Sequence, residues 1–229
     1  MQPLDEKLRA GLALLELPLD DAQVQQLLAY QALIQKWTKV YNLTAVRNPE
    51  EMLTHHLLDS LAVVNPLRQQ LAQSPGVAGF GVCPGSSLRL LDVGSGAGLP
   101  GVAIAICCPD IKVDCVDTVG KKAAFIQQVA VTLKLPNLRG VHARVESLTD
   151  KYQVISSRAF ASLFDFTRWS AQALAEQGIW MAMKGKYPAE ELLALPSHVA
   201  MFHVEQLDVP GLNAERCVLW MRSAESVGD

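Results

Sequence analysis

The sequence of 229 residues has no apolar run long enough to span a bilayer, and its N-terminus lacks the basic segment of a secretory signal. We therefore expect a soluble, cytoplasmic protein that does not bind membranes. Its five cysteines show no C-x-x-C spacing, which argues against a metal or redox centre and favours buried, reduced thiols. A net charge of −3 argues against general coating of nucleic acid but allows a local basic patch.

The most informative segment is a strand, a glycine turn and a helix in direct succession. Residues 88–93 form an apolar run that carries one acid, Asp92, and predicts a buried strand. Three alternating glycines follow: Gly94, Gly96 and Gly98. Residues 102–108 then predict a packed helix. Because the backbone of such a turn can approach a ligand at a helix N-terminus, this segment predicts a site for a nucleotide derivative.

Two cofactor classes fit this turn. Gly96, Gly98 and Gly101 satisfy the G-x-G-x-x-G pattern of dinucleotide folds, whereas Asp92 followed by G-x-G-x-G is typical of S-adenosylmethionine (SAM) folds. A carboxylate beside the turn would repel a pyrophosphate and attract the sulfonium and ammonium of SAM. We therefore expect SAM, and an NAD(P)-dependent oxidoreductase remains the alternative.

A second acid, Asp117, ends the next expected strand about twenty residues after the glycines, where such folds hold ribose hydroxyls. The alternative is that Asp117 caps the helix that follows it.

Strands and helices alternate after the turn, which predicts a doubly wound, mostly parallel α/β sheet. The expected strands are residues 88–93, 113–116, 138–142, 154–156 and 179–183, closed by a pair at 199–207 and 216–222. The expected helices are 102–108, 121–133 and 160–176.

Three helical stretches precede the turn, among them an amphipathic helix ending at Tyr41 and a helix opened by the capping sequence at residues 48–51. The expected organisation is a helical extension at residues 1–71, a Gly- and Pro-rich linker at 72–87 and a cofactor-binding domain at 88–229.

Six basic residues follow the carboxyl ends of the expected strands. They are Lys121, Lys122, Arg144, Arg158, Lys184 and Lys186. A single lysine is most often solvated surface. The shared position of the six nevertheless predicts a basic rim around the cofactor, which suits RNA. Removing Lys184 or Lys186 is expected to weaken RNA binding and to reduce its salt dependence.

Seven segments resemble one bacterial family, in the family's order and over nearly the whole chain. They are residues 41–47, 56–60, 91–101, 120–122, 144–146, 157–161 and 183–185. The family is the ribosomal RNA small subunit methyltransferase G, also called glucose-inhibited division protein B. The resemblance implies a seven-stranded, Rossmann-like, SAM-dependent methyltransferase that modifies N7 of a guanine in the 530 loop of 16S rRNA.

Carried onto matching positions, the resemblance implies five cofactor-binding residues. They are Gly94, Leu99, Val145, Glu146 and Arg158. Gly96, Gly98 and Asp117 join them from the reasoning above. Val145 and Glu146 would give adenine an apolar contact and an acceptor for its amine, while Arg158 suits either the cofactor or a nucleotide phosphate. Together with Arg158, the residues expected to hold RNA are Asn42, Lys121, Lys122, Lys184 and Lys186.

The target atom determines the expected mechanism. Guanine N7 carries a lone pair and no proton, so we expect no acid–base residue, and His55 and His56 are expected to serve in packing or in an interface. The expected partner is 16S rRNA or the small ribosomal subunit, bound by a monomer that needs no metal. A SAM-binding ribosome-assembly factor without catalysis is the second alternative, and a small-molecule methyltransferase is disfavoured by the basic rim.

Overall fold

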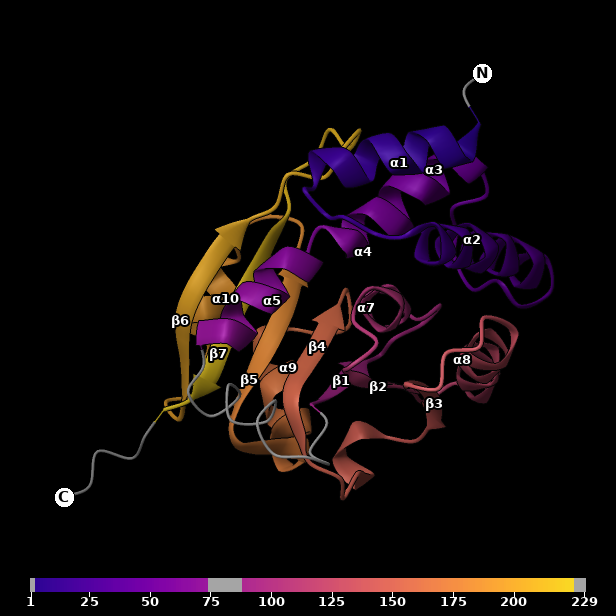
Figure 1. Cartoon of the computed structure of the whole chain (residues 1–229). Helices are drawn as coiled ribbons and strands as arrows, with labels where there is room; N and C mark the ends of the chain where they lie inside the picture. The colour runs from indigo at the N-terminus through magenta and orange to yellow at the C-terminus, as the bar shows by residue number, and fades with distance from the viewer. Residues whose placement is uncertain (1–2, 74–87, 225–229) are drawn as a thin grey trace.

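The computed structural model describes residues 3–73 and 88–224, in which helices pack on both faces of one central sheet (Figure 1). The expected linker at residues 72–87 and Cys83 lie outside these ranges, except for residues 72–73, which end a helix. The division into residues 1–71, 72–87 and 88–229 stays a prediction. Among the described helices, none has the length and apolarity that a membrane span requires.

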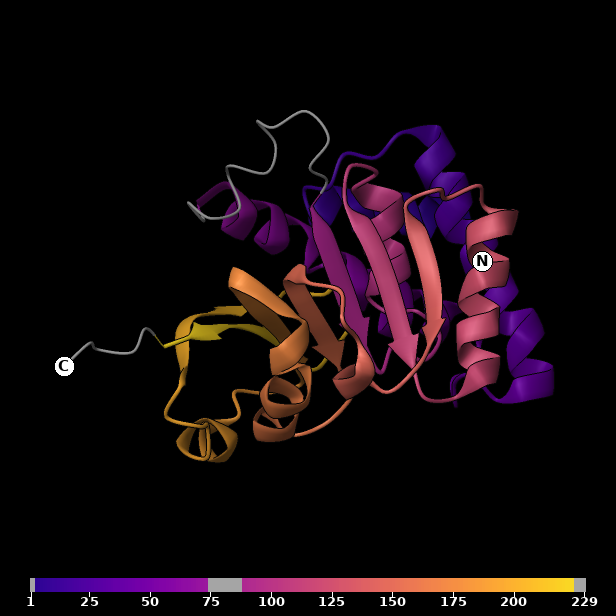
Figure 2. The ribbon, with the colours of Figure 1, turned by 90° about the horizontal axis from the view of Figure 1, so that it is seen from below.

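The sheet of the described chain has seven strands in the order β3-β2-β1-β4-β5-β7-β6 (Figure 2). The strands are β1 (Arg89–Val93), β2 (Lys112–Asp117), β3 (Leu138–His142), β4 (Tyr152–Arg158), β5 (Leu174–Lys184), β6 (Val199–Gln206) and β7 (Cys217–Ser223). β7 runs antiparallel to both of its neighbours, β5 and β6, and the other described strands all run in one direction. The expected doubly wound, mostly parallel sheet is therefore confirmed. Its strand order reverses between β1 and β4, where ligands bind in such sheets.

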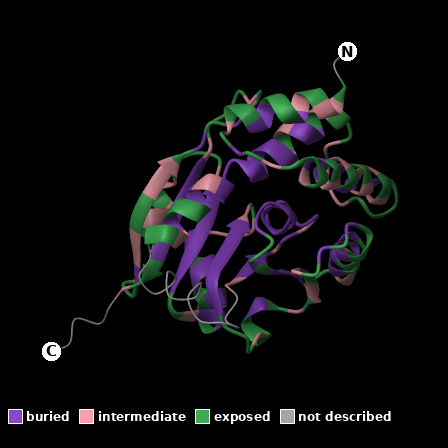
Figure 3. Ribbon diagram, viewed as in Figure 1, coloured by how far each residue is buried: buried purple, intermediate pink, exposed green. Residues whose placement is uncertain are grey.

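Two groups of helices cover the two faces. One face carries α1 (Leu4–Leu14), α2 (Asp21–Tyr41), α3 (Pro49–Met52), α4 (Asp59–Leu61), α5 (Val64–Gln73), α7 (Gly101–Cys107) and α8 (Gly120–Thr132). The other carries α9 (Leu163–Ser170) and α10 (Ala189–Leu193). Neighbouring strand residues enter different cores, since side chains alternate along a strand: Leu90 packs with the first group and Leu91 with the second. The central strands are accordingly buried (Figure 3).

The N-terminal helices dock directly onto the glycine turn and the helix after it. Asp20 and Gln23 form a capping box that starts α2, and the Gln23 side chain also donates to the Ile106 carbonyl at 2.8 Å. The hydroxyl of the fully buried Tyr30 donates to the Ala97 carbonyl at 2.6 Å. The helical extension and the glycine turn therefore share one core.

The helix opened by Asn48 contains an unusual segment. The Asn48 side chain accepts from the backbone N–H groups of Glu50 and Glu51, as expected of an N-cap. Between α3 and α4, residues Leu53–Leu58 (η1) are π-helical, a rare conformation that is frequent at functional sites. This stretch and the start of α4 carry His55, His56 and Asp59 toward the sheet.

The expected helix at residues 160–176 is wrong at both ends. Ser162 accepts from the Asp165 N–H and starts α9 at Leu163. A short 3₁₀ turn, Ala171–Ala173 (η4), ends the helical stretch, and Leu174 pairs with Tyr152 in the sheet. Residues that the apolar pattern assigned to a helix therefore pair in the sheet. β5 begins at Leu174, five residues before the expected residue 179.

Candidate functional site

The glycine turn has a left-handed backbone conformation, which is strained for residues other than glycine. Gly94 and Gly98 have φ values of +64° and +89°. A Cβ at Gly94 would collide with the Phe160 ring, and one at Gly98 would lie 2.5 Å from Ile126 Cδ1 and Val102 Cγ2. The turn therefore combines a left-handed backbone with close packing against its neighbours.

Asp92 does not face the ligand site as the charge argument assumed. The side chain is fully buried, with Oδ2 accepting from the Gly101 N–H at 3.0 Å and Oδ1 accepting from the Ser156 hydroxyl at 2.9 Å. Burial raises the pKa of Asp92 from 3.8 to about 6, although these two hydrogen bonds oppose the rise. Asp92 therefore anchors the first residue of α7, Gly101, through its backbone N–H.

Two cavities open at the carboxyl ends of the strands and meet at the turn. The first, of about 460 Å³, lies between the helical extension and the ends of β4, β5 and β7. The second, of about 410 Å³, lies beyond β1, β2 and β3. Gly94 and Ala159 line both cavities, so an elongated ligand can pass from one to the other over the turn.

The second cavity holds three of the expected cofactor residues: Asp117, Val145 and Glu146. Asp117 is buried, and its carboxylate accepts from the N–H groups of Gly96 (3.1 Å) and Val119 (2.8 Å), so it orders the turn. Lys122 lies 3.4 Å from the same carboxylate and lines this cavity rather than an outer rim. An apolar wall at Val145 beside the exposed carboxylate of Glu146 fits adenine, and a buried acid at a strand end fits ribose.

The first cavity holds Gly96, Leu99 and Arg158, whereas Gly98 lines neither cavity and instead packs beneath the turn. The Arg158 guanidinium donates to Asp59 Oδ2 at 2.6 Å and to the His55 carbonyl at 3.2 Å. The structure thus places a cation, Arg158, in the wall of the first cavity beside the glycine turn.

Sequence reasoning missed two residues of this cavity, Asp59 and Arg216. Asp59 lies within the family-like segment 56–60, which was the available signal, and Arg216 had none. Thr44 and His55 also line the cavity. His56 lies 2.6 Å from Thr44 Oγ1 through Nε2, and burial lowers the pKa of this imidazole, which keeps it neutral near pH 7.

The residues expected to hold RNA have unequal environments. Lys184 pairs with Glu191 at 2.8 Å and donates to the Ala161 carbonyl at 3.2 Å. Asn42 ends α2 in a left-handed conformation and accepts from Arg47 at 2.7 Å. Lys186 is exposed.

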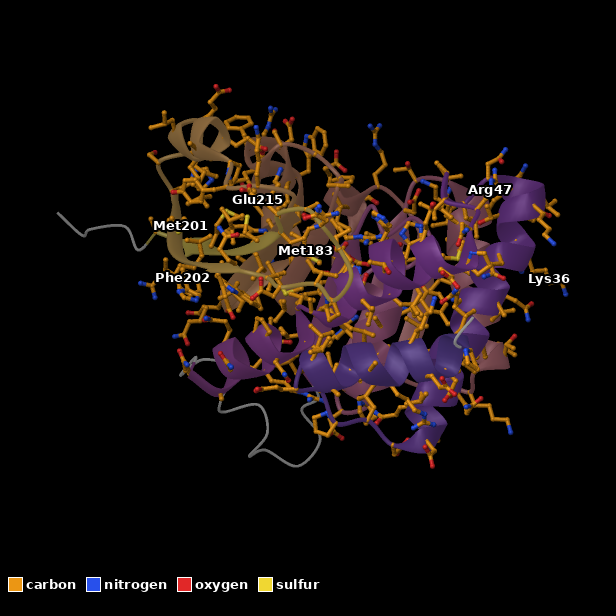
Figure 4. The ribbon with its side chains drawn as sticks, turned by 90° about the horizontal axis from the view of Figure 1, so that it is seen from above. Lys36, Arg47, Met183, Met201, Phe202 and Glu215 are labelled. Atoms are coloured by element: carbon orange, nitrogen blue, oxygen red, sulfur yellow. The ribbon has the colours of Figure 1, made fainter. Side chains whose placement is uncertain are left out.

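Lys121 is also exposed and lies 5.2 Å from the centre of the Tyr41 ring, at the α2 end of the molecule. Figure 4 shows Lys36 and Arg47 at that end, Met201 and Phe202 at the opposite end, and Met183 between them. Met183 lines the first cavity and lies in this view between the α2 end and the β6 edge of the sheet.

The described residues contain buried cysteines but no cluster that could bind a metal ion. Cys107, Cys108, Cys115 and Cys217 are buried free thiols, as expected. Across residues 3–73 and 88–224, no three His, Cys, Asp or Glu side chains are arranged to hold a metal ion.

A doubly wound sheet with a glycine turn at its switch point and two joined cavities defines a Rossmann-like fold with a site for a nucleotide-derived ligand. A crystal structure of TrmN from Thermus thermophilus shares this fold, with a TM-score of 0.50 and 20% identity over 75% of this chain and 53% of that one. The family model for rRNA small subunit methyltransferase G (GidB) matches residues 23–219, and the chain belongs to this family.

Curated relatives agree over nearly the whole length. Ribosomal RNA small subunit methyltransferase G of Polaromonas naphthalenivorans is 66% identical over 221 residues, which cover 96% of both chains. The protein of the same name from Albidiferax ferrireducens is 66% identical over 228 residues, covering 98% of this chain and 99% of the relative. The expected family and cofactor are therefore confirmed, and the NAD(P)-dependent alternative is not supported.

Proposed function

We propose that this rRNA methyltransferase transfers the methyl group of SAM to N7 of a guanine in the 530 loop of 16S rRNA. The observation that carries the proposal is the pair of cavities that share Gly94, combined with membership of the family. We further propose that it acts as a cytoplasmic monomer on 16S rRNA or the small ribosomal subunit. In this proposal residues 1–71 are a helical extension, 72–87 a linker and 88–229 the SAM-binding domain.

The proposed cofactor seat spans both cavities. Val145 and Glu146 contact adenine, and Asp117 approaches the ribose. Gly94 and Gly96 let the backbone approach the ligand, with Leu99 as an apolar wall. Gly98 acts from beneath by fixing the turn against Ile126. The adenosine would thus occupy the second cavity, and the methionine portion would enter the first.

The reaction requires the protein mainly to align guanine N7 with the methyl group of SAM. SAM supplies an electrophilic methyl group, and guanine N7 supplies a lone pair without first losing a proton, so no residue is assigned as a general base. His56 is held neutral by burial and bonded to Thr44, which suits a positioning role. The cavity walls would hold N7 in line with the methyl group and exclude water. Holding the two reactants in this geometry would accelerate the transfer.

The proposed RNA contacts are expected to contribute unequally to binding, because some of these side chains are exposed and others already bind protein groups. Lys121 and Lys186 are exposed and suit phosphate contacts. Lys122, Lys184 and Asn42 already bind protein groups, so their proposed effect on RNA is to shape the surface it meets. Arg158 faces the first cavity, where cofactor and RNA come together.

The test uses tritiated SAM and small subunits from cells that lack this enzyme. After digestion of the RNA to nucleosides, the proposal expects the label in 7-methylguanosine. Label in another nucleoside would contradict the N7 assignment. An absence of label in RNA, with SAM binding intact, would favour the ribosome-assembly factor without catalysis.

A further inference from the structure

Three side chains from distant parts of the sequence meet at the first cavity. Asp59 begins α4, Arg158 ends β4, and Arg216 directly precedes β7. Asp59 Oδ2 accepts from Arg158 at 2.6 Å, and Asp59 Oδ1 accepts from Arg216 Nε at 2.7 Å. We call this group the arginine clasp.

The arginine clasp places a net positive charge in the partly desolvated wall of the first cavity. Two guanidinium groups and one carboxylate leave one net positive charge. The Asp59 side chain is 4% exposed, and those of Arg158 and Arg216 are 19% and 23% exposed. All three residues line the first cavity, whereas the nearby Lys184 is neutralised by Glu191. A half-buried cation at a cavity wall favours an anion, because water screens it poorly there.

We propose that the arginine clasp binds an oxyanion of the reactants, either the carboxylate of the methionine moiety or a phosphate of the RNA. Asp59 is the positioning residue, since it holds the two guanidinium groups at fixed places on opposite oxygens. Arg216 is the additional binding residue. The proposal depends on the SAM cofactor and the RNA substrate, and not on guanine N7 or the 530 loop.

A second buried ion-pair network provides a control. Asp114 is also buried and accepts hydrogen bonds from Arg89 at 3.0 Å, Arg139 at 2.7 Å and the Tyr152 hydroxyl at 2.7 Å. Asp150 also pairs with both arginines, so this network carries no net charge. Arg89 begins β1, so this cluster lies at the opposite ends of the strands, and none of its members lines the two cavities. Disrupting it tests the loss of a buried ion-pair network without touching the site.

The experiment compares Asp59→Ala and Arg216→Gln with Asp114→Ala, each monitored by thermal unfolding. Calorimetry measures affinity for S-adenosylhomocysteine and for 5′-methylthioadenosine, which lacks the amino-acid carboxylate. Filter binding measures affinity for small ribosomal subunits at saturating S-adenosylhomocysteine. Arg216→Lys, which retains charge but not the guanidinium fork, completes the set.

The clasp variants are expected to lose about tenfold or more in affinity for one oxyanion ligand, because each removes or misplaces a charge-assisted hydrogen bond. Weaker binding of S-adenosylhomocysteine with unchanged methylthioadenosine identifies the carboxylate. Weaker binding of subunits with unchanged S-adenosylhomocysteine identifies the phosphate. Arg216→Lys should recover part of the affinity, and Asp114→Ala should lower the melting temperature alone.

Two results would overturn the proposal. One is unchanged affinity for both ligand classes in Arg216→Gln. The other is equal loss for S-adenosylhomocysteine and methylthioadenosine, because that pattern means a distorted cavity. If Asp59→Ala does not fold, the Arg216→Gln and Arg216→Lys pair still decides between these outcomes, since Arg216 lies at the margin of the cavity.

Discussion

Replacing the buried Asp92 by asparagine is expected to change how the stability of the fold depends on pH. The asparagine carbonyl can accept from the Gly101 N–H, and its amide can donate to Ser156 Oγ, whose hydroxyl can turn to the Leu91 carbonyl at 3.4 Å. The shape and most hydrogen bonds are therefore kept, and only the ionisable group is lost.

The size of the effect follows from the raised pKa. A folded-state pKa of about 6 against 3.8 in the unfolded chain means that the folded protein binds the proton more tightly. The contribution of Asp92 to stability is fully present below the unfolded pKa and is lost as the pH rises through about 6. The total change is about 3 kcal/mol, at about 1.4 kcal/mol per pKa unit, and about half of it falls between pH 5 and pH 8.

The assay is urea unfolding of wild type and Asp92→Asn between pH 5 and pH 8. The difference in unfolding free energy should move toward the variant by about 1.4 kcal/mol over this range. Asp150→Asn is the control: Arg89 lowers the pKa of that exposed carboxyl, so its titration window lies below pH 3.8 and its difference should stay constant. Parallel curves for Asp92→Asn and wild type would refute the buried-charge reasoning.

Three further predictions concern the turn, the lysines and the adenine seat. Gly98→Ala should lower the unfolding free energy by about 2–5 kcal/mol and Gly96→Ala by about 1–2 kcal/mol. Both have positive φ, but a Cβ at Gly98 would be crowded and one at Gly96 would not, so equal losses in chemical denaturation would contradict this. Lys186→Gln should reduce the salt slope of RNA binding by about one phosphate contact, as the sequence predicted. Because Glu191 neutralises Lys184, the expectation for Lys184 changes: Lys184→Gln should lower the melting temperature and leave the slope unchanged. The reverse pattern in filter binding would reject the ion-pair interpretation. Glu146→Gln should weaken S-adenosylhomocysteine binding about tenfold in calorimetry, and an unchanged affinity would remove Glu146 from the adenine seat.

The sheet could be predicted because its signals are local. The strand, glycine turn and helix at residues 88–108 form a continuous pattern, and Gly94 and Gly98 do occupy left-handed conformations. The alternation of strands with helices predicted that most strands would run parallel. The error at residues 160–176 arose because an apolar segment suits a helix or a strand, and pairing of Leu174 with Tyr152 decides between them.

The site was harder to predict because its parts are distant in sequence. Arg216 lies 157 residues from Asp59, and no spacing rule links them. The role expected for Asp92 also depended on geometry, since the same acid can face a ligand or accept from the Gly101 N–H beneath the turn. Lys184 is the last residue of β5, one position earlier in the structure than the sequence predicted, and its pairing with Glu191 could not be predicted from the sequence.

The most direct test of the central claim is a map of 7-methylguanosine in small-subunit rRNA, obtained by reduction and aniline cleavage from cells with and without this protein. One guanine in the 530 loop should lose its cleavage when the protein is absent and regain it when the protein is restored. Cleavage at that guanine that persists without the protein would contradict the account.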